Sequence, residues 1–299
     1  MPPVPPFGRL LTAMVTPFTD DGGVDYDGAA VLASYLVDEL AHDGLVISGT
    51  TGEAPTTSDA EKAELLRAVV EAVGDRAHVL AGVGTFNTEH TLNLAADAEK
   101  AGAAGLLVVT PYYSRPPQTG LFDHFRTVAD ATGLPIMLYD IPHRSGVPIA
   151  TDTLLRLAEH PRIVAVKDAK GDLPASAQVM AATELAYYSG DDAMTLPLLS
   201  IGAVGVVGTS THFTGVGMRR LIEAHLGGDP QTALEWHRRL LPAFTGVFAT
   251  QGCILVKAGL QVQGRGNGRL RSPMPPATDS ELVVLMAALE ASGLPTRRV

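Results

Sequence analysis

The chain has 299 residues, of which 46% are hydrophobic and 18% charged, and its formal net charge is −10. This size fits one barrel-sized domain or two average domains, and the composition excludes a disordered chain. The acidic balance, with no basic stripe, argues against nucleic acid as a partner. The single cysteine, Cys253, cannot form an internal disulfide. We expect a cytoplasmic protein that does not enter the membrane, because the apolar runs are short and the first residues lack the order of a signal peptide.

Short apolar strands alternate with helices along most of the chain. The strands are predicted at residues 10–15, 44–47, 78–83, 105–109, 134–138, 163–166, 185–188 and 205–207. Helices are predicted between them at 26–40, 58–73, 88–101, 119–131, 151–159, 174–183 and 196–201. Ser58 and Glu61 have the spacing of a capping box at the start of the second helix.

About eight such alternations predict an α/β fold, a closed (β/α)8 barrel. An open doubly wound sheet is the alternative, but it usually has a glycine-rich phosphate loop in its first turn, and this chain has no such motif. We assign residues 1–217 to the barrel. The remaining residues, 218–299, are predicted to form a C-terminal helical extension packed on it, with helices at 219–226, 231–248, 254–262 and 279–292.

A lysine follows the sixth predicted strand, in the segment Val166-Lys167-Asp168. Burial at a strand end lowers the pKa of a lysine, and the neutral amine is a nucleophile that can form a Schiff base with a carbonyl. The alternative is that Lys167 forms a structural ion pair with Asp168, Asp191 or another acid. The segment alone favours the ion pair, whereas the rest of the chain favours the reactive amine.

Hydroxyl groups dominate the carboxyl ends of the other predicted strands, where the active site of a (β/α)8 barrel lies. Tyr139 and Lys167 are about one β/α unit apart, so we expect them on neighbouring strands facing one cavity. A phenol beside the amine can deliver and recover the protons that Schiff-base formation requires. The alternative is an ordinary strand-end aromatic. H-E-x-x-H and a nucleophile elbow are both absent, so we expect neither a metal nor a hydrolase triad.

Two loops contain residues suited to binding carboxylates. The turn at 49–53 reads Gly-Thr-Thr-Gly-Glu, and its glycines let the backbone approach a ligand. Arg144, after the fifth strand, suits bidentate capture of a second carboxylate. Taken separately, a plain glycine turn and a solvated arginine explain these features as well.

Five segments stand out when they are taken together: Gly49-Thr50-Thr51-Gly52-Glu53, Val109-Thr110-Pro111-Tyr112-Tyr113, Leu138-Tyr139-Asp140-Ile141-Pro142, Val166-Lys167-Asp168-Ala169 and Ser189-Gly190-Asp191-Asp192. In order and spacing they resemble the dihydrodipicolinate synthase family, especially its actinobacterial members. The family belongs to the pyruvate-dependent class I aldolases, the N-acetylneuraminate lyase superfamily, which share the barrel and the lysine and tyrosine found here at 167 and 139. Thr51, Arg144 and the paired tyrosines favour the synthase branch.

The resemblance implies a lyase that condenses pyruvate with L-aspartate-4-semialdehyde in the diaminopimelate pathway to L-lysine, without a cofactor. It implies four catalytic residues: Lys167 forms the Schiff base, Tyr139 transfers protons, and Thr50 and Tyr113 complete the relay. Tyr113 is expected to enter from a neighbouring subunit of a homotetramer built from tight dimers. The substrate-binding residues implied by the resemblance are Thr51, Val207 and Gly190 and, for the aldehyde, Arg144.

Several positions depart from the family pattern. Asp140 stands where many relatives have asparagine, and the eighth strand reads Gly-Val-Val-Gly-Thr-Ser where relatives usually have Gly-Val/Phe-Ile-Ser-Val. At the feedback site for L-lysine, Asp59 and Lys62 replace histidines, Phe86 replaces an asparagine and His90 replaces a glutamate. We therefore expect weak or absent inhibition by L-lysine.

Two other functions compete with this interpretation. A sister aldolase would use a sugar acid or a hydroxy-oxoglutarate instead of the semialdehyde. A pyruvate-binding regulatory protein on an inactive barrel would require a broken relay, but Thr50, Tyr113, Tyr139 and Lys167 are all present.

Overall fold

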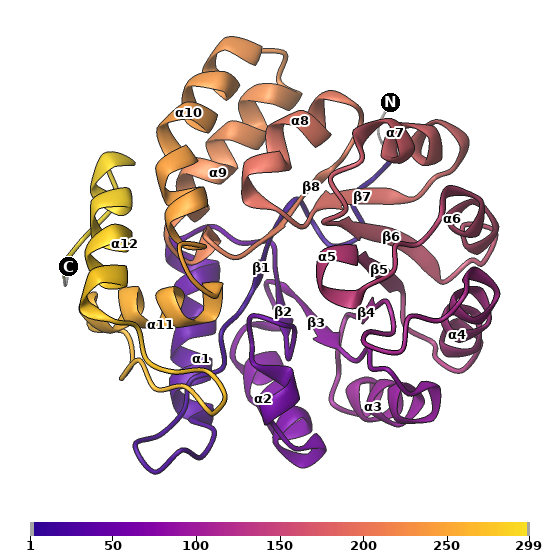
Figure 1. Ribbon diagram of the computed structural model, residues 1–299, viewed down its shortest axis with the longest axis horizontal. Coiled ribbons are helices and arrows are strands. Elements are labelled where there is room, and N and C mark those ends of the chain that lie inside the picture. Colours follow the sequence, from indigo (N-terminus) through magenta and orange to yellow (C-terminus); the bar gives the residue numbers. More distant parts are fainter. Residues whose placement is uncertain (1–2, 298–299) are drawn as a thin grey trace.

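A closed ring of parallel strands forms the centre of the computed structural model, which describes residues 3–297 (Figure 1). Within these residues the ring contains eight strands in chain order, each hydrogen-bonded to the next and the last to the first. They are β1 (Leu10–Ala13), β2 (Gly44–Ile47), β3 (His78–Gly82), β4 (Gly105–Val109), β5 (Ile136–Asp140), β6 (Ile163–Asp168), β7 (Ala186–Ser189) and β8 (Gly205–Gly208). The predicted (β/α)8 barrel is confirmed.

Helices surround the ring and extend it on one side (Figure 1). Those between strands are α1 (Tyr26–Ser34) with a π-turn at Tyr35–Glu39, α2 (Asp59–Val73), α3 (Thr88–Lys100), α4 (Gln118–Asp130), α5 (Pro142–Ser145), α6 (Thr151–Leu157), α7 (Leu173–Ala182) and α8 (Thr195–Ser200). Short 3-10 turns cover Ala54–Thr56 and Asp192–Met194. The helices after β8 are α9 (Thr211–Leu226), α10 (Pro230–Gly246), α11 (Gly252–Val262) and α12 (Asp279–Ala291). The capping box of Ser58 and Glu61 is present as predicted.

The inside of the ring is filled at one end. Phe7 and Tyr188 are fully buried in the interior cluster, and the Tyr188 hydroxyl donates to the carbonyl of Gly8 at 2.8 Å. Gly8 precedes β1, so this plug lies at the amino ends of the parallel strands. The opposite, carboxyl end is therefore where a cavity can form.

The C-terminal helices pack on one another and on the ring. Helix α9 packs against α10, and α12 packs against α10 and α11. The segment between α11 and α12, residues 264–277, returns to the N-terminal half, where the Arg271 guanidinium donates to the carbonyl of Gly22 and to the Glu61 carboxylate. Helix α9 runs across residue 217, and the predicted division of the chain at that point stays a prediction.

Two elements differ from their predicted bounds for identifiable reasons. The helix predicted from residue 219 begins at Thr211, because the polar residues in its first turn are buried and hydrogen-bonded. The His212 ring, for example, pairs with the Thr209 carbonyl at 2.8 Å and accepts from the Val15 amide at 3.2 Å. The loop predicted after the fifth strand contains the one-turn helix α5, which carries Arg144.

Candidate active site

Lys167 is the residue before the last in β6, and it is only 5% exposed. Burial lowers the pKa of its ammonium to about 8; the Asp192 carboxylate opposes this shift and the Arg144 charge adds to it. No carboxylate among residues 3–297 lies within ion-pair distance of its Nζ atom. The predicted alternative, a structural ion pair, is wrong: Asp168 instead accepts from the Lys170 amide and from Ser176, and Asp191 caps a 3-10 turn.

Tyr139 lies directly beside this lysine. The two residues are paired in register between β5 and β6, and the Lys167 Nζ atom lies 4.2 Å from the centre of the Tyr139 ring. Burial raises the pKa of the Tyr139 phenol above its ordinary value, while the Arg144 charge opposes the shift. The phenol is thus held in its protonated form, as a proton donor must be. Within the described chain, its hydroxyl makes no hydrogen bond to another residue.

The threonine turn lies across the cavity from the lysine. After β2, Gly52 N donates to the Gly49 carbonyl at 3.1 Å and Glu53 N to the Thr50 carbonyl at 3.2 Å, so the segment is a tight turn. The Thr51 hydroxyl is 3.3 Å from that of Thr209, which follows β8. This contact joins the ends of β2 and β8 around the space above the lysine.

Gly190 lines the site, whereas Val207 lies behind it in β8. A Cβ atom at Gly190 would lie 3.0 Å from Ala169 Cβ and 3.1 Å from Lys167 Cγ, so glycine leaves the room that the lysine stem occupies. Val207 is fully buried in β8, where it is paired with Leu11 of β1. Any role of Val207 would therefore involve its backbone.

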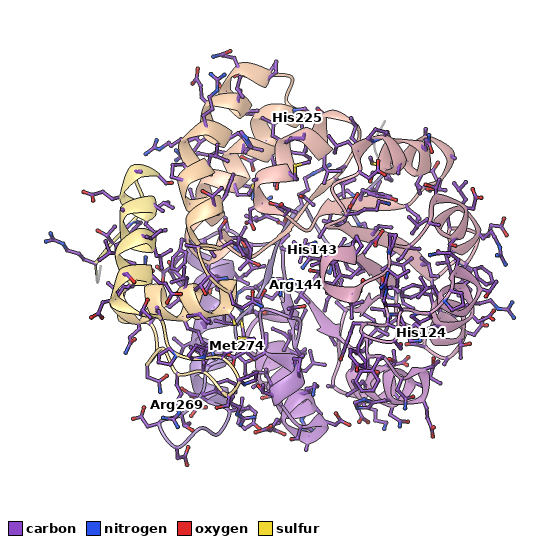
Figure 2. All side chains as sticks on the ribbon, viewed as in Figure 1. His124, His143, Arg144, His225, Arg269 and Met274 are labelled. Atoms are coloured by element: carbon purple, nitrogen blue, oxygen red, sulfur yellow. The ribbon has the colours of Figure 1, made fainter. Side chains whose placement is uncertain are left out.

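Arg144 projects from α5 near the centre of the molecule, next to His143 (Figure 2). Its Nη2 atom donates to the Oε1 atom of Gln251, just before α11, at 3.0 Å. Sequence analysis did not identify Gln251, because no local pattern connects two residues 107 positions apart.

Tyr113 stands apart from the other predicted relay residues. Its side chain is 93% exposed, and its backbone is in the left-handed region with φ of 69°. A non-glycine residue rarely adopts this backbone conformation. Because almost all of its side chain is exposed, Tyr113 packs against little of its own chain, and within residues 3–297 it makes no hydrogen bond to Tyr139.

A single cavity of about 960 Å³ nevertheless joins most of these residues. Its lining contains every predicted site residue except Val207, namely Thr50, Thr51, Tyr113, Tyr139, Arg144, Lys167 and Gly190. It also contains residues that the prediction missed, among them Gln251 and Cys253. The Cys253 thiol is buried in α11.

Asp192 is a further residue that the prediction did not single out. Its carboxylate accepts from the Thr209 amide at 3.1 Å and from the Ser210 hydroxyl at 2.7 Å. Burial raises the pKa of this carboxyl, and these two donors oppose the shift. Asp192 is the acid that partly counters the effect of burial on the Lys167 amine. The adjacent acids Asp191 and Asp192 at a strand end were the available signal.

Two structural findings bear on partners of other kinds. Residues 3–297 contain no group of three histidine, cysteine or acidic side chains placed to hold a metal ion. No helix in the same range has both the length and the apolar character needed to cross a membrane.

Comparison with known proteins identifies the family. The model of the dihydrodipicolinate synthetase family matches residues 6–292. The 4-hydroxy-tetrahydrodipicolinate synthase of Acidothermus cellulolyticus is 64% identical over 96% of this chain and 93% of its own. The dihydrodipicolinate synthase of Cyanidioschyzon merolae, solved with lysine bound, has a TM-score of 0.94 and 42% identity, covering 97% and 99% of the two chains.

A structure of the Acinetobacter baumannii dihydrodipicolinate synthase, described as chloride-inhibited and complexed with pyruvate, has a TM-score of 0.93 and 32% identity over 97% of this chain and all of that one. The activity predicted from the sequence is the one in the names of these relatives. The chain thus belongs, as the sequence predicted, to the dihydrodipicolinate synthetase family of enzymes.

Proposed function

We propose that this chain is a lyase that condenses pyruvate with L-aspartate-4-semialdehyde, the reaction of a 4-hydroxy-tetrahydrodipicolinate synthase in the diaminopimelate pathway to L-lysine. The observation that carries the proposal is the Lys167 amine, which is buried, has a pKa lowered to about 8 and has no carboxylate partner within residues 3–297. At neutral pH roughly a tenth of such an amine is uncharged and able to attack a ketone.

The first half of the reaction uses the pairing of Lys167 with Tyr139. The neutral amine attacks the keto carbon of pyruvate and forms a carbinolamine. Tyr139, held protonated by its burial, donates a proton to the hydroxyl of the carbinolamine, which departs as water and leaves an iminium on Lys167. Loss of a methyl proton from the iminium then gives an enamine.

In the second half, the enamine carbon attacks the aldehyde, and the new alkoxide takes up a proton. The amino group of the condensed semialdehyde then attacks the iminium carbon, closes the ring and displaces the Lys167 amine. One carbon–carbon bond and one carbon–nitrogen bond form in the product, one water is released, and the enzyme is regenerated.

Two groups of residues hold the two carboxylates. Thr51, with Gly190 and the backbone of Val207, is suited to the carboxylate of pyruvate, because the threonine turn faces the lysine across the cavity. Arg144 lines the same cavity and carries the charge that suits the carboxylate of the semialdehyde.

The relay requires a second subunit. Thr50 and Tyr113 would supply Tyr139 with protons, and a phenol that is 93% exposed on a left-handed backbone is placed to reach outward rather than inward. We propose that Tyr113 enters the cavity of a neighbouring copy, in a homotetramer built from dimers that share this residue. We also propose a cytoplasmic location.

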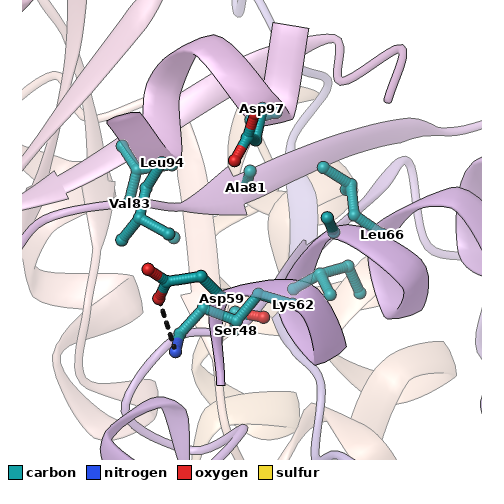
Figure 3. Close-up of a pocket in the computed structure, with 12 residues that line it drawn as sticks. Ser48, Asp59, Lys62, Leu66, Ala81, Val83, Leu94 and Asp97 are labelled. Carbon is teal, nitrogen blue, oxygen red and sulfur yellow. Dashed lines mark ion pairs between the residues drawn. The ribbon is translucent and has the colours of Figure 1, made fainter. Parts of the chain in front are cut away.

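Inhibition by L-lysine is expected to be weak or absent. Asp59 is already engaged by the His90 ring at 2.9 Å. It also pairs with the Lys62 ammonium at 3.8 Å (Figure 3). Lys62 places a positive charge where a cationic ligand would have to bind, and the cavity beside it holds only about 20 Å³. Strong, saturable inhibition by L-lysine in a steady-state assay would contradict this expectation.

An assay with two aldehydes tests the function. The purified protein is supplied with pyruvate and either L-aspartate-4-semialdehyde or a sugar aldehyde, and product formation is followed by mass spectrometry. We expect turnover of the semialdehyde and at least a hundredfold lower kcat/KM for the sugar aldehyde, which lacks the carboxylate that Arg144 would bind. Preference for the sugar aldehyde, or cleavage of a keto-acid aldol alone, would identify a sister aldolase instead.

A further inference from the structure

Gln251 connects the C-terminal helices to the arginine of the cavity. Its Oε1 atom accepts two hydrogen bonds, one from Arg144 Nη2 at 3.0 Å and one from the Gly252 amide at 3.1 Å. Both neighbours are donors only, so the oxygen of the carboxamide must face them. Its NH2 group must therefore face the other way, and within residues 3–297 it makes no hydrogen bond.

The position of Gln251 is fixed by the residue after it. A Cβ atom at Gly252 would lie 2.9 Å from the Phe248 ring and 3.2 Å from Thr209 Cγ2. Glycine therefore lets the start of α11 approach the end of β8 closely. The side chain of Gln251 caps α11, and the residue lines the same cavity as Arg144 and Lys167.

Gln251 is uncharged, and this affects how Arg144 can bind an anion. A carboxylate at this position would orient the Arg144 guanidinium equally well, but it would cancel the positive charge. A carboxamide orients the guanidinium and leaves its full charge available to an anion. It also supplies a second donor, the NH2 group, on a residue that lines the cavity.

We propose that Gln251 is a specificity-determining residue for the second substrate: it orients Arg144 and donates its NH2 group to the carboxylate that Arg144 binds. The inference rests on the proposed function, because it assigns the semialdehyde carboxylate to Arg144. It adds that this carboxylate is recognised by a charged donor on α5 and a neutral donor at the start of α11, which are hydrogen-bonded to each other.

Two substitutions separate this role from a structural one. Gln251→Glu keeps an oxygen that can accept from Arg144 and from the Gly252 amide, but replaces the NH2 group with a negatively charged oxygen. Gln251→Ala removes all of these contacts. If Gln251 only caps the helix, the Glu variant is harmless and the Ala variant is impaired. If Gln251 keeps the charge of Arg144 available and donates to the substrate, the Glu variant is the worse of the two.

The experiment measures KM for each substrate and the borohydride-trapped pyruvate adduct on Lys167. Gln178→Glu, which makes the same change of charge at an exposed position on α7, is the matched control. For Gln251→Ala we expect KM for the semialdehyde to rise about three- to tenfold, as the loss of one or two hydrogen bonds predicts. For Gln251→Glu we expect a rise of more than about tenfold, because like charges then face each other. KM for pyruvate and the adduct yield should match those of the control in both variants.

An unchanged KM for the semialdehyde in Gln251→Glu, or equal changes for the two substrates, would overturn the inference. That failure is distinct from failure of the proposed function, which would appear in the unsubstituted enzyme as no turnover of the semialdehyde or no adduct on Lys167.

Discussion

Two lysines are buried to the same degree in this molecule but have different surroundings. Lys167 is 5% exposed and Lys257, on α11, is 4% exposed, and each ammonium lies about 4 Å from the centre of an aromatic ring. Burial lowers the pKa of both. Lys257, however, is paired with the Glu53 carboxylate and donates to the Arg269 carbonyl at 2.8 Å, whereas Lys167 has no carboxylate partner in the described chain.

The difference shows that burial alone does not decide whether a lysine is structural or reactive. An ammonium with a buried carboxylate and a carbonyl is fixed in position, and the ion pair opposes the effect of burial on its pKa. An ammonium without such a partner loses its proton more easily and remains free to form a bond. We infer that the ion-pair partner, rather than the depth, separates a structural lysine from a reactive one in this fold.

The structural lysine still serves the site indirectly. Glu53 ends the threonine turn, and its carboxylate also accepts from the Arg271 amide at 3.0 Å. Arg271 in turn donates to Glu61 on α2. Through Glu53, the C-terminal segment therefore holds the turn that carries Thr50 and Thr51.

The largest expected effect is on Lys167. Lys167→Met should lower kcat/KM by about 10⁴-fold or more, because no other group can form the covalent intermediate. Its thermal stability should be unchanged or higher, since an unpaired buried cation is replaced by an apolar chain of similar size. Steady-state kinetics and thermal unfolding measure the two quantities. Activity of Lys167→Met above a few per cent of the unsubstituted enzyme would contradict the assignment of Lys167 as the reactive lysine.

Tyr139→Phe is expected to have the next largest effect. The ring over the Lys167 ammonium remains, so only the hydroxyl is lost, and kcat should fall about 10²- to 10⁴-fold. Pyruvate trapping on Lys167 should still occur, but more slowly. Normal turnover in this variant would assign the proton transfer to another group.

Lys257→Met should act on stability. It leaves the Glu53 carboxylate buried without its cation, which costs about 3–5 kcal/mol in free energy of unfolding. The double variant Glu53→Gln/Lys257→Met should recover at least half of this loss, because neither charge remains. Equilibrium urea unfolding compares the two variants. Equal destabilisation of the single and double variants would show that the unpaired Glu53 carboxylate is not the cause of the lost stability.

The smallest effect is a dependence on pH that belongs to Lys167 alone. With a pKa of about 8, the fraction of neutral amine increases about tenfold for each unit by which the pH rises toward 8, and it levels off above that pH. The rate of pyruvate trapping should follow this curve from pH 6 to 9. A rate independent of pH across this range would mean that the amine is not the titrating nucleophile.

Much of the fold could be predicted from the sequence. The alternation of strands and helices is local and repeated, so it identified the barrel and placed Tyr139 and Lys167 on neighbouring strands, where they are paired in register. The ends of elements were less accurate. The strand predicted at 134–138 lies at Ile136–Asp140, because Pro135 has no amide hydrogen to donate to a neighbouring strand.

Contacts between distant segments were not predictable in the same way. The ion pair of Lys257 with Glu53 joins residues 204 positions apart, and Gln251 reaches Arg144 across 107 positions. Neither contact has a spacing or a motif, because both depend on how the C-terminal helices return to the barrel. The roles of the predicted site residues came from family resemblance, and the structure adds the cavity that joins all of them but Val207.

Borohydride reduction in the presence of pyruvate, followed by peptide mass spectrometry, tests the central claim most directly. Both buried lysines are present in the same sample, so each controls for the other. We predict a reduced pyruvyl adduct on Lys167 and an unmodified Lys257. An adduct on Lys257, or a Lys167 that stays unmodified while pyruvate is bound, would contradict the account.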